Sequence, residues 1–143
     1  EILPADKPRH LLGLSHPDDI FVGVEAGVDT FDCVAPTREA RHGRIYTPDG
    51  NYNIKRSMYR DDTGVLAPGC DCPTCRAGHT RAKLRALLKS AEPTKRARAF
   101  NLLTAHNTRF IIRLCEQIRQ AIIDGSYRQF RDDFCRRYYR ASA

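Results

Sequence analysis

The spacing of apolar residues predicts an alternating front half for this chain. Residues 9–14 form a short apolar run typical of a buried strand, and residues 28–34 form a second β-rich run. Between them, helix-start signals at 15–19 precede a short apolar stretch that we expect to end at Gly27. A strand, a short helix and a strand with tight connections predict parallel pairing, and therefore part of an α/β sheet or barrel.

The middle of the chain carries loop and turn signals. We expect residues 36–44 to form an arginine-rich loop. Residues 45–47 and 52–54 flank the turn-forming sequence Pro-Asp-Gly-Asn at 48–51, which predicts a β-hairpin. Residues 60–69 are rich in turn formers and lead into a cluster of cysteines.

Beyond residue 79 the hydrophobic period becomes that of helices. One amphipathic helix is predicted over 80–91 and is interrupted by Pro93; a long helix follows over about 97–123, and a last one over 126–139. The residues expected to face inward are Leu84, Leu87 and Leu88 in the first helix, Leu103, Phe110, Leu114, Ile118 and Ile122 in the second, and Tyr127, Phe130 and Phe134 in the third.

Composition adds an expectation about the partner. The 143 residues suffice for one domain with a real core. The chain has 24 Lys and Arg against 17 Asp and Glu, a net charge of +7, and most of the basic residues are arginine. Arginine suits bidentate phosphate recognition, so RNA or DNA is the leading partner, although a basic surface without a partner is the plain alternative. No apolar run is long enough for a bilayer and no signal peptide is visible, so we expect no membrane partner.

Three cysteines within six residues are the strongest chemical signal. Cys70, Cys72 and Cys75 form a C-x-C-x-x-C run, which brings three thiolates within reach of one tetrahedral zinc ion that needs a fourth ligand. Clustering of this kind indicates a metal and a reducing cytosol more than disulfides. The remaining cysteines stand alone in apolar or helical contexts: Cys33, Cys115 and Cys135.

The spacing leaves the fourth ligand open between two histidines. His79 lies four residues after Cys75, so a short loop can bring it to the metal. His106 lies on the predicted long helix, and its imidazole would clamp the cysteine loop onto that helix. Either histidine can equally be an ordinary surface or core residue.

Three motifs together resemble a known family. The segment 27–38, the C-x-C-x-x-C run and the pair His106-Asn107 resemble the C-terminal part of the queuine tRNA-ribosyltransferases, also called tRNA-guanine transglycosylases. The resemblance extends over essentially the whole chain. It implies an α/β fold: the C-terminal portion of a (β/α)8 TIM-like barrel with an inserted zinc-binding subdomain and C-terminal helices. Residues 1–47 would be the last barrel elements, 48–110 the zinc-binding subdomain and 111–143 the closing helices.

The same resemblance implies a reaction and a ligand set. Family members exchange guanine at the tRNA wobble position for queuine or its 7-deazaguanine precursor through a covalent ribosyl-aspartate intermediate, and Asp32 matches the nucleophile. The resemblance also favours His106 over His79 as the fourth ligand. It therefore implies one structural Zn²⁺ per chain, held by Cys70, Cys72, Cys75 and His106. It also implies a cytoplasmic enzyme that acts as a homodimer.

Two segments match RNA contacts of the family. We expect Arg38 and Arg41 to carry phosphate or base-edge contacts. The turn at 13–19 is weaker evidence, because Ser15 and His16 replace the expected glycine-containing version. Without the resemblance, both segments read as solvated loops. The full set of expected RNA-contacting residues is Gly13, Leu14, Ser15, His16, Pro17, Asp18, Asp19, Thr37, Arg38, Glu39, Ala40 and Arg41.

Part of the family's active site is absent from these 143 residues. Its second catalytic aspartate, a general acid/base, and most of its guanine pocket belong to the N-terminal part of the barrel. One alternative is therefore a stand-alone zinc-stabilised module that binds RNA or mediates dimerisation without catalysis. Another is a non-catalytic partner subunit of the same family, but Asp32 in its full Phe-Asp-Cys-Val setting argues against it.

Overall fold

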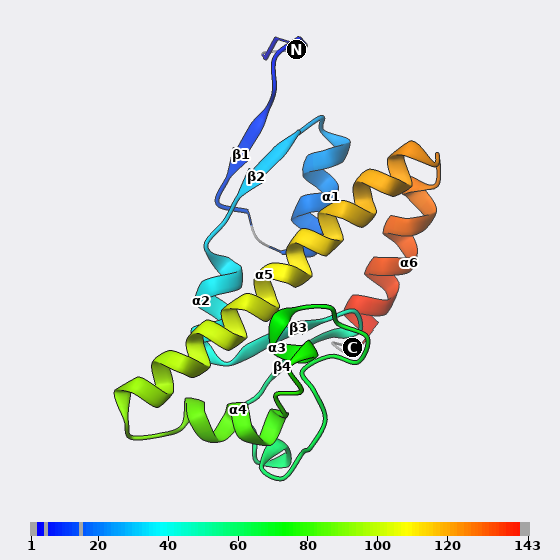
Figure 1. Cartoon of the computed structure of the whole chain (residues 1–143). Helices are drawn as coiled ribbons and strands as arrows, with labels where there is room; N and C mark the ends of the chain where they lie inside the picture. The colour runs from blue at the N-terminus through cyan, green and yellow to red at the C-terminus, as the bar shows by residue number, and fades with distance from the viewer. Residues whose placement is uncertain (1–2, 5, 15, 141–143) are drawn as a thin grey trace. The chain divides into compact units, whose positions relative to one another are not determined.

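A computed structural model of the chain describes residues 3–4, 6–14 and 16–140 (Figure 1). Helices and strands are mixed along the sequence, in agreement with the predicted α/β fold. The chain forms two compact units, Glu1–Ala35 and Pro36–Ala143. No helix within the described residues has the length and apolar character needed to span a membrane.

The first unit is a β-α-β element made of β1 (His10–Leu12), α1 (Pro17–Glu25) and β2 (Thr30–Asp32). The strands pair in parallel, with Leu11 opposite Phe31, which confirms the predicted pairing. A Cβ atom at Gly23 would lie 2.7 Å from the Phe31 ring and 3.5 Å from Leu11, so α1 packs closely on these two side chains. Because side chains alternate along a strand, the other face of the sheet carries His10, Leu12, Thr30 and Asp32.

The second unit begins with a helix and a hairpin and continues with helices. The hairpin is antiparallel and pairs Thr47 with Gly50 across a two-residue turn, close to the prediction. It lies against the longest helix (Figure 1). The elements are α2 (Ala35–His42), β3 (Arg44–Thr47), β4 (Gly50–Asn53), the 3₁₀ helix η1 (Ser57–Tyr59), α3 (Pro73–Arg76), α4 (Arg81–Leu88), α5 (Pro93–Ile123) and α6 (Tyr127–Tyr139).

The structure corrects two helix predictions. The expected loop over 36–44 is mostly helix α2, because alanine, arginine and glutamate favour helices and Pro36 is tolerated in a first turn. Pro93 likewise is the first residue of α5, whereas the sequence predicted only that it interrupts the preceding helix. Gly43 then separates α2 from β3: its φ of +86° is a conformation that other residues rarely adopt.

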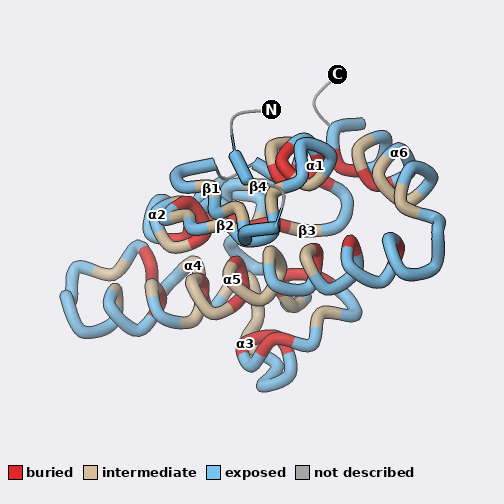
Figure 2. Tube along the Cα trace, turned by 90° about the horizontal axis from the view of Figure 1, so that it is seen from above, coloured by how far each residue is buried: buried red, intermediate tan, exposed pale blue. Residues whose placement is uncertain are grey.

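The main core lies between the hairpin, α4 and α5. Large side chains with no more than 4 % exposure come from these elements and from the segment between β4 and α3: Ile45, Ile54, Leu66, Leu84, Leu88 and Leu103. Figure 2 shows that the buried positions of α5 recur along the helix, where Leu114 and Ile118 are also buried. The prediction for Ile122 is wrong, since it is 51 % exposed and Ala121 occupies the inward position one residue earlier.

Candidate functional site

The structure brings four potential metal ligands together in the second unit. The ligand atoms of Cys70, Cys72, Cys75 and His106 all lie within 4.8 Å of one another. The imidazole Nδ1 of His106 lies 3.6, 3.4 and 3.5 Å from the Sγ atoms of Cys70, Cys72 and Cys75. His79 lies outside this cluster and is partly exposed.

These distances fit a tetrahedral site. Bonds of about 2.3 Å to sulfur and about 2.0–2.1 Å to nitrogen, at tetrahedral angles, place the sulfur and nitrogen ligands roughly 3.5–3.6 Å apart. Three thiolates and one imidazole also form a soft donor set of the kind that zinc sites use. The residues can therefore hold one metal ion with four protein ligands.

Hydrogen bonds and a proline fix the conformation of the loop that carries the three cysteines, independently of a metal ion. Cys72 caps the short helix α3, where its Sγ accepts a hydrogen bond of 3.3 Å from the backbone N–H of Cys75. Pro73 occupies the first turn, where its missing N–H is not needed. The buried hydroxyl of Thr74 donates to the Leu102 carbonyl at 2.6 Å, which attaches α3 to α5.

Hydrogen bonds within the cluster shift its pKa values. The bond to Cys75, together with burial, raises the pKa of Cys72 to about 11, and the same bond lowers the pKa of Cys75. Burial lowers the pKa of His106, but hydrogen bonds with Cys70 and Cys72 outweigh it and raise the value to about 9. Because ligation requires thiolates and a neutral imidazole, metal binding releases protons from this cluster.

The second nitrogen of His106 fixes which atom faces the metal site. Nε2 lies 2.9 Å from the carbonyl oxygen of Tyr46, which can only accept, so Nε2 carries the hydrogen and donates it. In the neutral imidazole that ligation requires, Nδ1 then keeps its lone pair and points at the three sulfur atoms. An orienting bond of this kind is typical of ligating histidines.

Asn107, next to His106, braces the same strand and α2. Its Oδ1 accepts a hydrogen bond from the Tyr46 N–H at 3.1 Å, and its Nδ2 donates to the carbonyls of Arg44 at 2.9 Å and Pro36 at 3.2 Å. The side chain is fully buried, so these bonds replace those with water. The sequence indicates Asn107 only as the neighbour of His106 and gives no sign of this bracing role, because its partners are 61 to 71 residues away.

Replacement of Asn107 by alanine should lower the free energy of unfolding by about 2–4 kcal/mol, because three backbone groups, two of them in buried hydrogen bonds, lose their partners. Urea unfolding at fixed metal concentration measures the change. Asn101→Ala is the control, since Asn101 is exposed on the same helix and should change stability by less than about 0.5 kcal/mol. Equal effects of the two substitutions would contradict the bracing role.

An ionic clamp also holds the cysteine loop from outside. Asp71 lies between two of the clustered cysteines and accepts hydrogen bonds from Arg109 at 2.6–3.1 Å. These bonds hold the pKa of Asp71 below its usual range. Arg109 also pairs with Glu116 one heptad further along α5. The sequence did not reveal this clamp, because its partners are 38 residues apart.

Asp32 occupies the position expected of a catalytic side chain in a parallel sheet. It is the last residue of β2, it is exposed, and it pairs with Leu12 of β1. Its carbonyl accepts a hydrogen bond of 2.8 Å from the N–H of Gly13, so the turn after β1 is attached to the Asp32 backbone. Functional groups commonly lie at the carboxyl ends of parallel strands.

The residues expected to contact RNA differ in exposure. In the first unit Pro17 is buried, Asp19 is partly exposed, and Ser15 lies outside the described residues. In the second unit Ala40 is fully buried within the core. The exposed members of the set are Gly13, Leu14, His16, Asp18, Arg38 and Arg41, whereas Thr37 and Glu39 are partly exposed.

Comparison with known proteins now identifies the family. The sequence profile of queuine tRNA-ribosyltransferase matches residues 1–140. The chain belongs to the queuine tRNA-ribosyltransferase family. The profile thus includes both the strand that carries Asp32 and the whole of the metal-ligand cluster.

Individual members of the queuine tRNA-ribosyltransferase family are similar to this chain over nearly its whole length. The enzyme of Dictyoglomus turgidum is 45 % identical over 139 residues, which are 97 % of this chain and 34 % of that protein. That of Lactococcus lactis subsp. cremoris is 46 % identical over 96 % of this chain and 35 % of its own length. That of Symbiobacterium thermophilum is 41 % identical over 99 % of this chain and 34 % of its own length. The chain therefore spans about a third of the length of these relatives.

Proposed function

We propose that this chain is the C-terminal part of a tRNA-guanine transglycosylase. The enzyme would exchange guanine at the wobble position of tRNA for queuine or its 7-deazaguanine precursor. The observation that carries the proposal is the exposed Asp32 at the carboxyl end of β2, in a chain that matches this family along its length. The parallel β1–β2 pair with α1 between them is what the last strands of a (β/α)8 barrel would supply.

The proposed chemistry is a double displacement at one carbon. A carboxylate oxygen of Asp32 attacks C1′ of the wobble nucleoside, the bond from C1′ to guanine N9 breaks, and a ribosyl ester forms. The departing guanine takes a proton from a general acid, which in this family is an aspartate of the preceding part of the barrel. The incoming deazaguanine then attacks C1′, loses its proton to the same group and releases Asp32, so the configuration is retained.

The metal in this proposal is Zn²⁺ with a structural role. Four protein ligands leave no open position for substrate, so the ion would hold the cysteine loop on α5. His106 and Asn107 continue this attachment to β3, and Asn107 reaches the first turn of α2. The zinc-binding residues would therefore keep α2 in place without taking part in the reaction.

Replacement of Arg38 by alanine should weaken tRNA binding roughly three- to tenfold and lower the slope of log K against log salt by about 1. The guanidinium is exposed on α2 and forms no side-chain ion pair or hydrogen bond with the described residues. Fluorescence anisotropy with tRNA at several salt concentrations measures both quantities. Arg119→Ala, an exposed arginine of α5, should leave them unchanged, and equal losses for both variants would contradict a specific contact.

Base exchange tests the function as a whole. The full-length protein that carries this chain should incorporate labelled guanine into tRNA with a wobble guanine and should fail with tRNA bearing adenine there. A protein that binds tRNA and metal without exchange would instead be a zinc-stabilised RNA-binding or dimerisation module. The metal-ligand cluster and the exposed arginines of α2 support that second candidate, because neither depends on Asp32. The family resemblance further supports a homodimer and a cytoplasmic location.

A further inference from the structure

The β3–β4 hairpin carries a cavity that the proposed reaction does not use. It has a volume of about 240 Å³ and is lined by Arg44, Asn51, Tyr52, Asn53 and Arg56. Two arginines and two asparagines thus line one space, and no aspartate or glutamate is among the lining residues. All four groups have N–H donors, and the only formal charges are positive.

The walls of this hairpin cavity are held in place by the surrounding structure. Arg44 donates through Nη1 to Asn51 Oδ1 at 3.1 Å, and its Nε pairs with Glu39 of α2 at 2.8 Å. On the other side, Nε of Arg85 donates to the carbonyls of Lys55 and Arg56 at 3.3 and 3.0 Å. The backbone of Arg56 is therefore held against α4, whereas its side chain forms no ion pair or hydrogen bond with the residues that the structure describes.

Positive charge in the cavity is only partly compensated. Arg44 is 52 % exposed even though it pairs with Glu39. Arg56 is exposed, and its guanidinium has no ion pair or hydrogen bond with any described residue. Guanidinium groups with free donors bind phosphate oxygens in a bidentate manner, and neighbouring amide N–H groups can complete such a contact.

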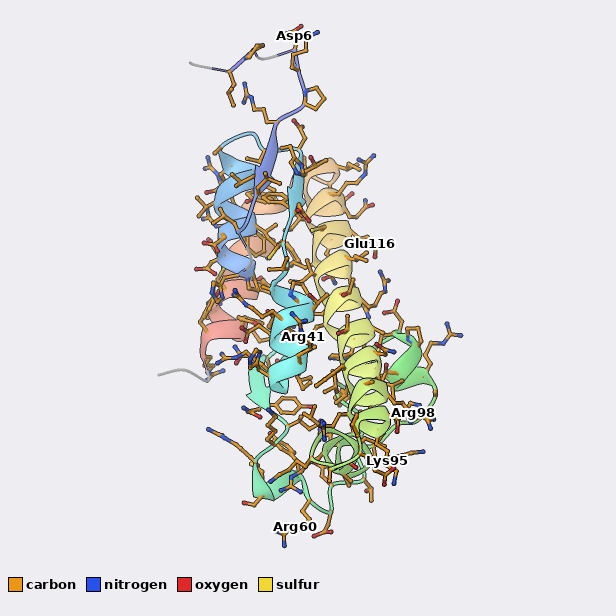
Figure 3. The ribbon with its side chains drawn as sticks, turned by 90° about the vertical axis from the view of Figure 1, so that its left-hand side faces the viewer. Asp6, Arg41, Arg60, Lys95, Arg98 and Glu116 are labelled. Carbon is orange, nitrogen blue, oxygen red and sulfur yellow. The ribbon has the colours of Figure 1, made fainter. Side chains whose placement is uncertain are left out.

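The cavity lies close to α2. Gly43 alone separates α2 from β3, and the pair between Glu39 and Arg44 ties the helix to the hairpin. Figure 3 shows Arg41 on α2 and Arg98 on α5. Arg41 and Arg44 are three residues apart in sequence, on either side of this short connection. The hairpin that carries the cavity is therefore tied directly to the helix that carries Arg38 and Arg41.

We propose that the hairpin cavity binds a phosphate of the RNA backbone, and that Arg56, assisted by Arg44, is a phosphate-contacting residue. This inference rests on the proposed function, since it takes tRNA as the partner. It extends the RNA-binding surface beyond the segments that the sequence indicated, onto β4 and the residues that follow it.

The test compares Arg56→Gln and Arg56→Lys with Arg98→Gln in the full-length protein. Arg98 is an exposed arginine of α5, so its replacement removes the same charge from another element. Binding of a tRNA anticodon stem-loop is measured by anisotropy over a range of salt concentrations. The Arg56→Gln change should raise Kd roughly three- to tenfold and lower the salt slope by about 1, whereas Arg56→Lys should retain the slope.

The outcomes separate this inference from the proposed function. Arg56 has no side-chain partner among the described residues, so its replacement should leave the melting temperature unchanged and a binding loss would not reflect misfolding. If the wild-type protein binds tRNA and both Arg56→Gln and Arg98→Gln keep its Kd and salt slope, the phosphate site alone is overturned. Equal losses in the two variants would indicate a general charge effect and would also overturn it. Absence of tRNA binding by the wild-type protein would overturn the proposed function itself.

Discussion

Replacement of Cys72 by serine is expected to release the metal ion and to unfold the unit 36–143. Cys72 is fully buried, caps α3 and lies 3.4 Å from Nδ1 of His106, so its loss removes a ligand and a cap together. Structural zinc contributes about 10–16 kcal/mol to the folding of small zinc modules. That is as large as the whole stability of a typical domain, which is about 5–15 kcal/mol.

The measurements are metal content by mass spectrometry and thermal unfolding followed by circular dichroism. Wild-type protein should carry one metal ion per chain, and the Cys72→Ser variant should carry much less and lose its cooperative transition. Cys115→Ser is the matched control, because Cys115 is partly buried on α5 but lies outside the cluster. One retained metal ion per chain and an unchanged melting temperature in the Cys72 variant would refute a ligand role.

Local patterns predicted most of the elements because the signals there are local. The parallel pairing of β1 and β2 follows from the short connection through α1, and the hairpin follows from its turn residues. The helix α2 escaped prediction since its few apolar side chains show no clear period. It is stabilised by burial of Ala40 and by the bond from Asn107 to Pro36, and both depend on distant parts of the chain.

The metal-ligand cluster was predictable only in part from spacing. The C-x-C-x-x-C run places three sulfur atoms together through a single short loop, so its geometry is encoded locally. His106 lies 31 residues beyond Cys75. Spacing alone does not distinguish it from His79 as the fourth ligand, and only the family resemblance favours it. The contacts that support the site join residues still further apart in sequence. Asn107 forms hydrogen bonds with backbone groups 61 to 71 residues away, a separation at which no sequence periodicity carries information.

Replacement of Asp32 by asparagine is expected to reduce base exchange by about 10³-fold or more while tRNA binding is retained. Asparagine keeps the size of the side chain but lacks the anionic oxygen that would form the ribosyl ester. The folded unit should tolerate the change, because Asp32 is exposed and its bond from Gly13 uses the backbone carbonyl and not the side chain. Exchange of labelled guanine measures the loss, and anisotropy measures binding.

Asp29→Asn provides the matched control for this change. Asp29 lies in the same segment, and its carboxylate accepts a hydrogen bond of 2.8 Å from the backbone N–H of Arg9, a role that an asparagine oxygen can fill. Its exchange rate should therefore stay within a few-fold of wild type. A denaturation-resistant tRNA adduct should form with wild-type protein and with Asp29→Asn. The same adduct on Asp32→Asn would show that another residue bonds to C1′, because an amide in that position has no carboxylate oxygen with which to form the ester.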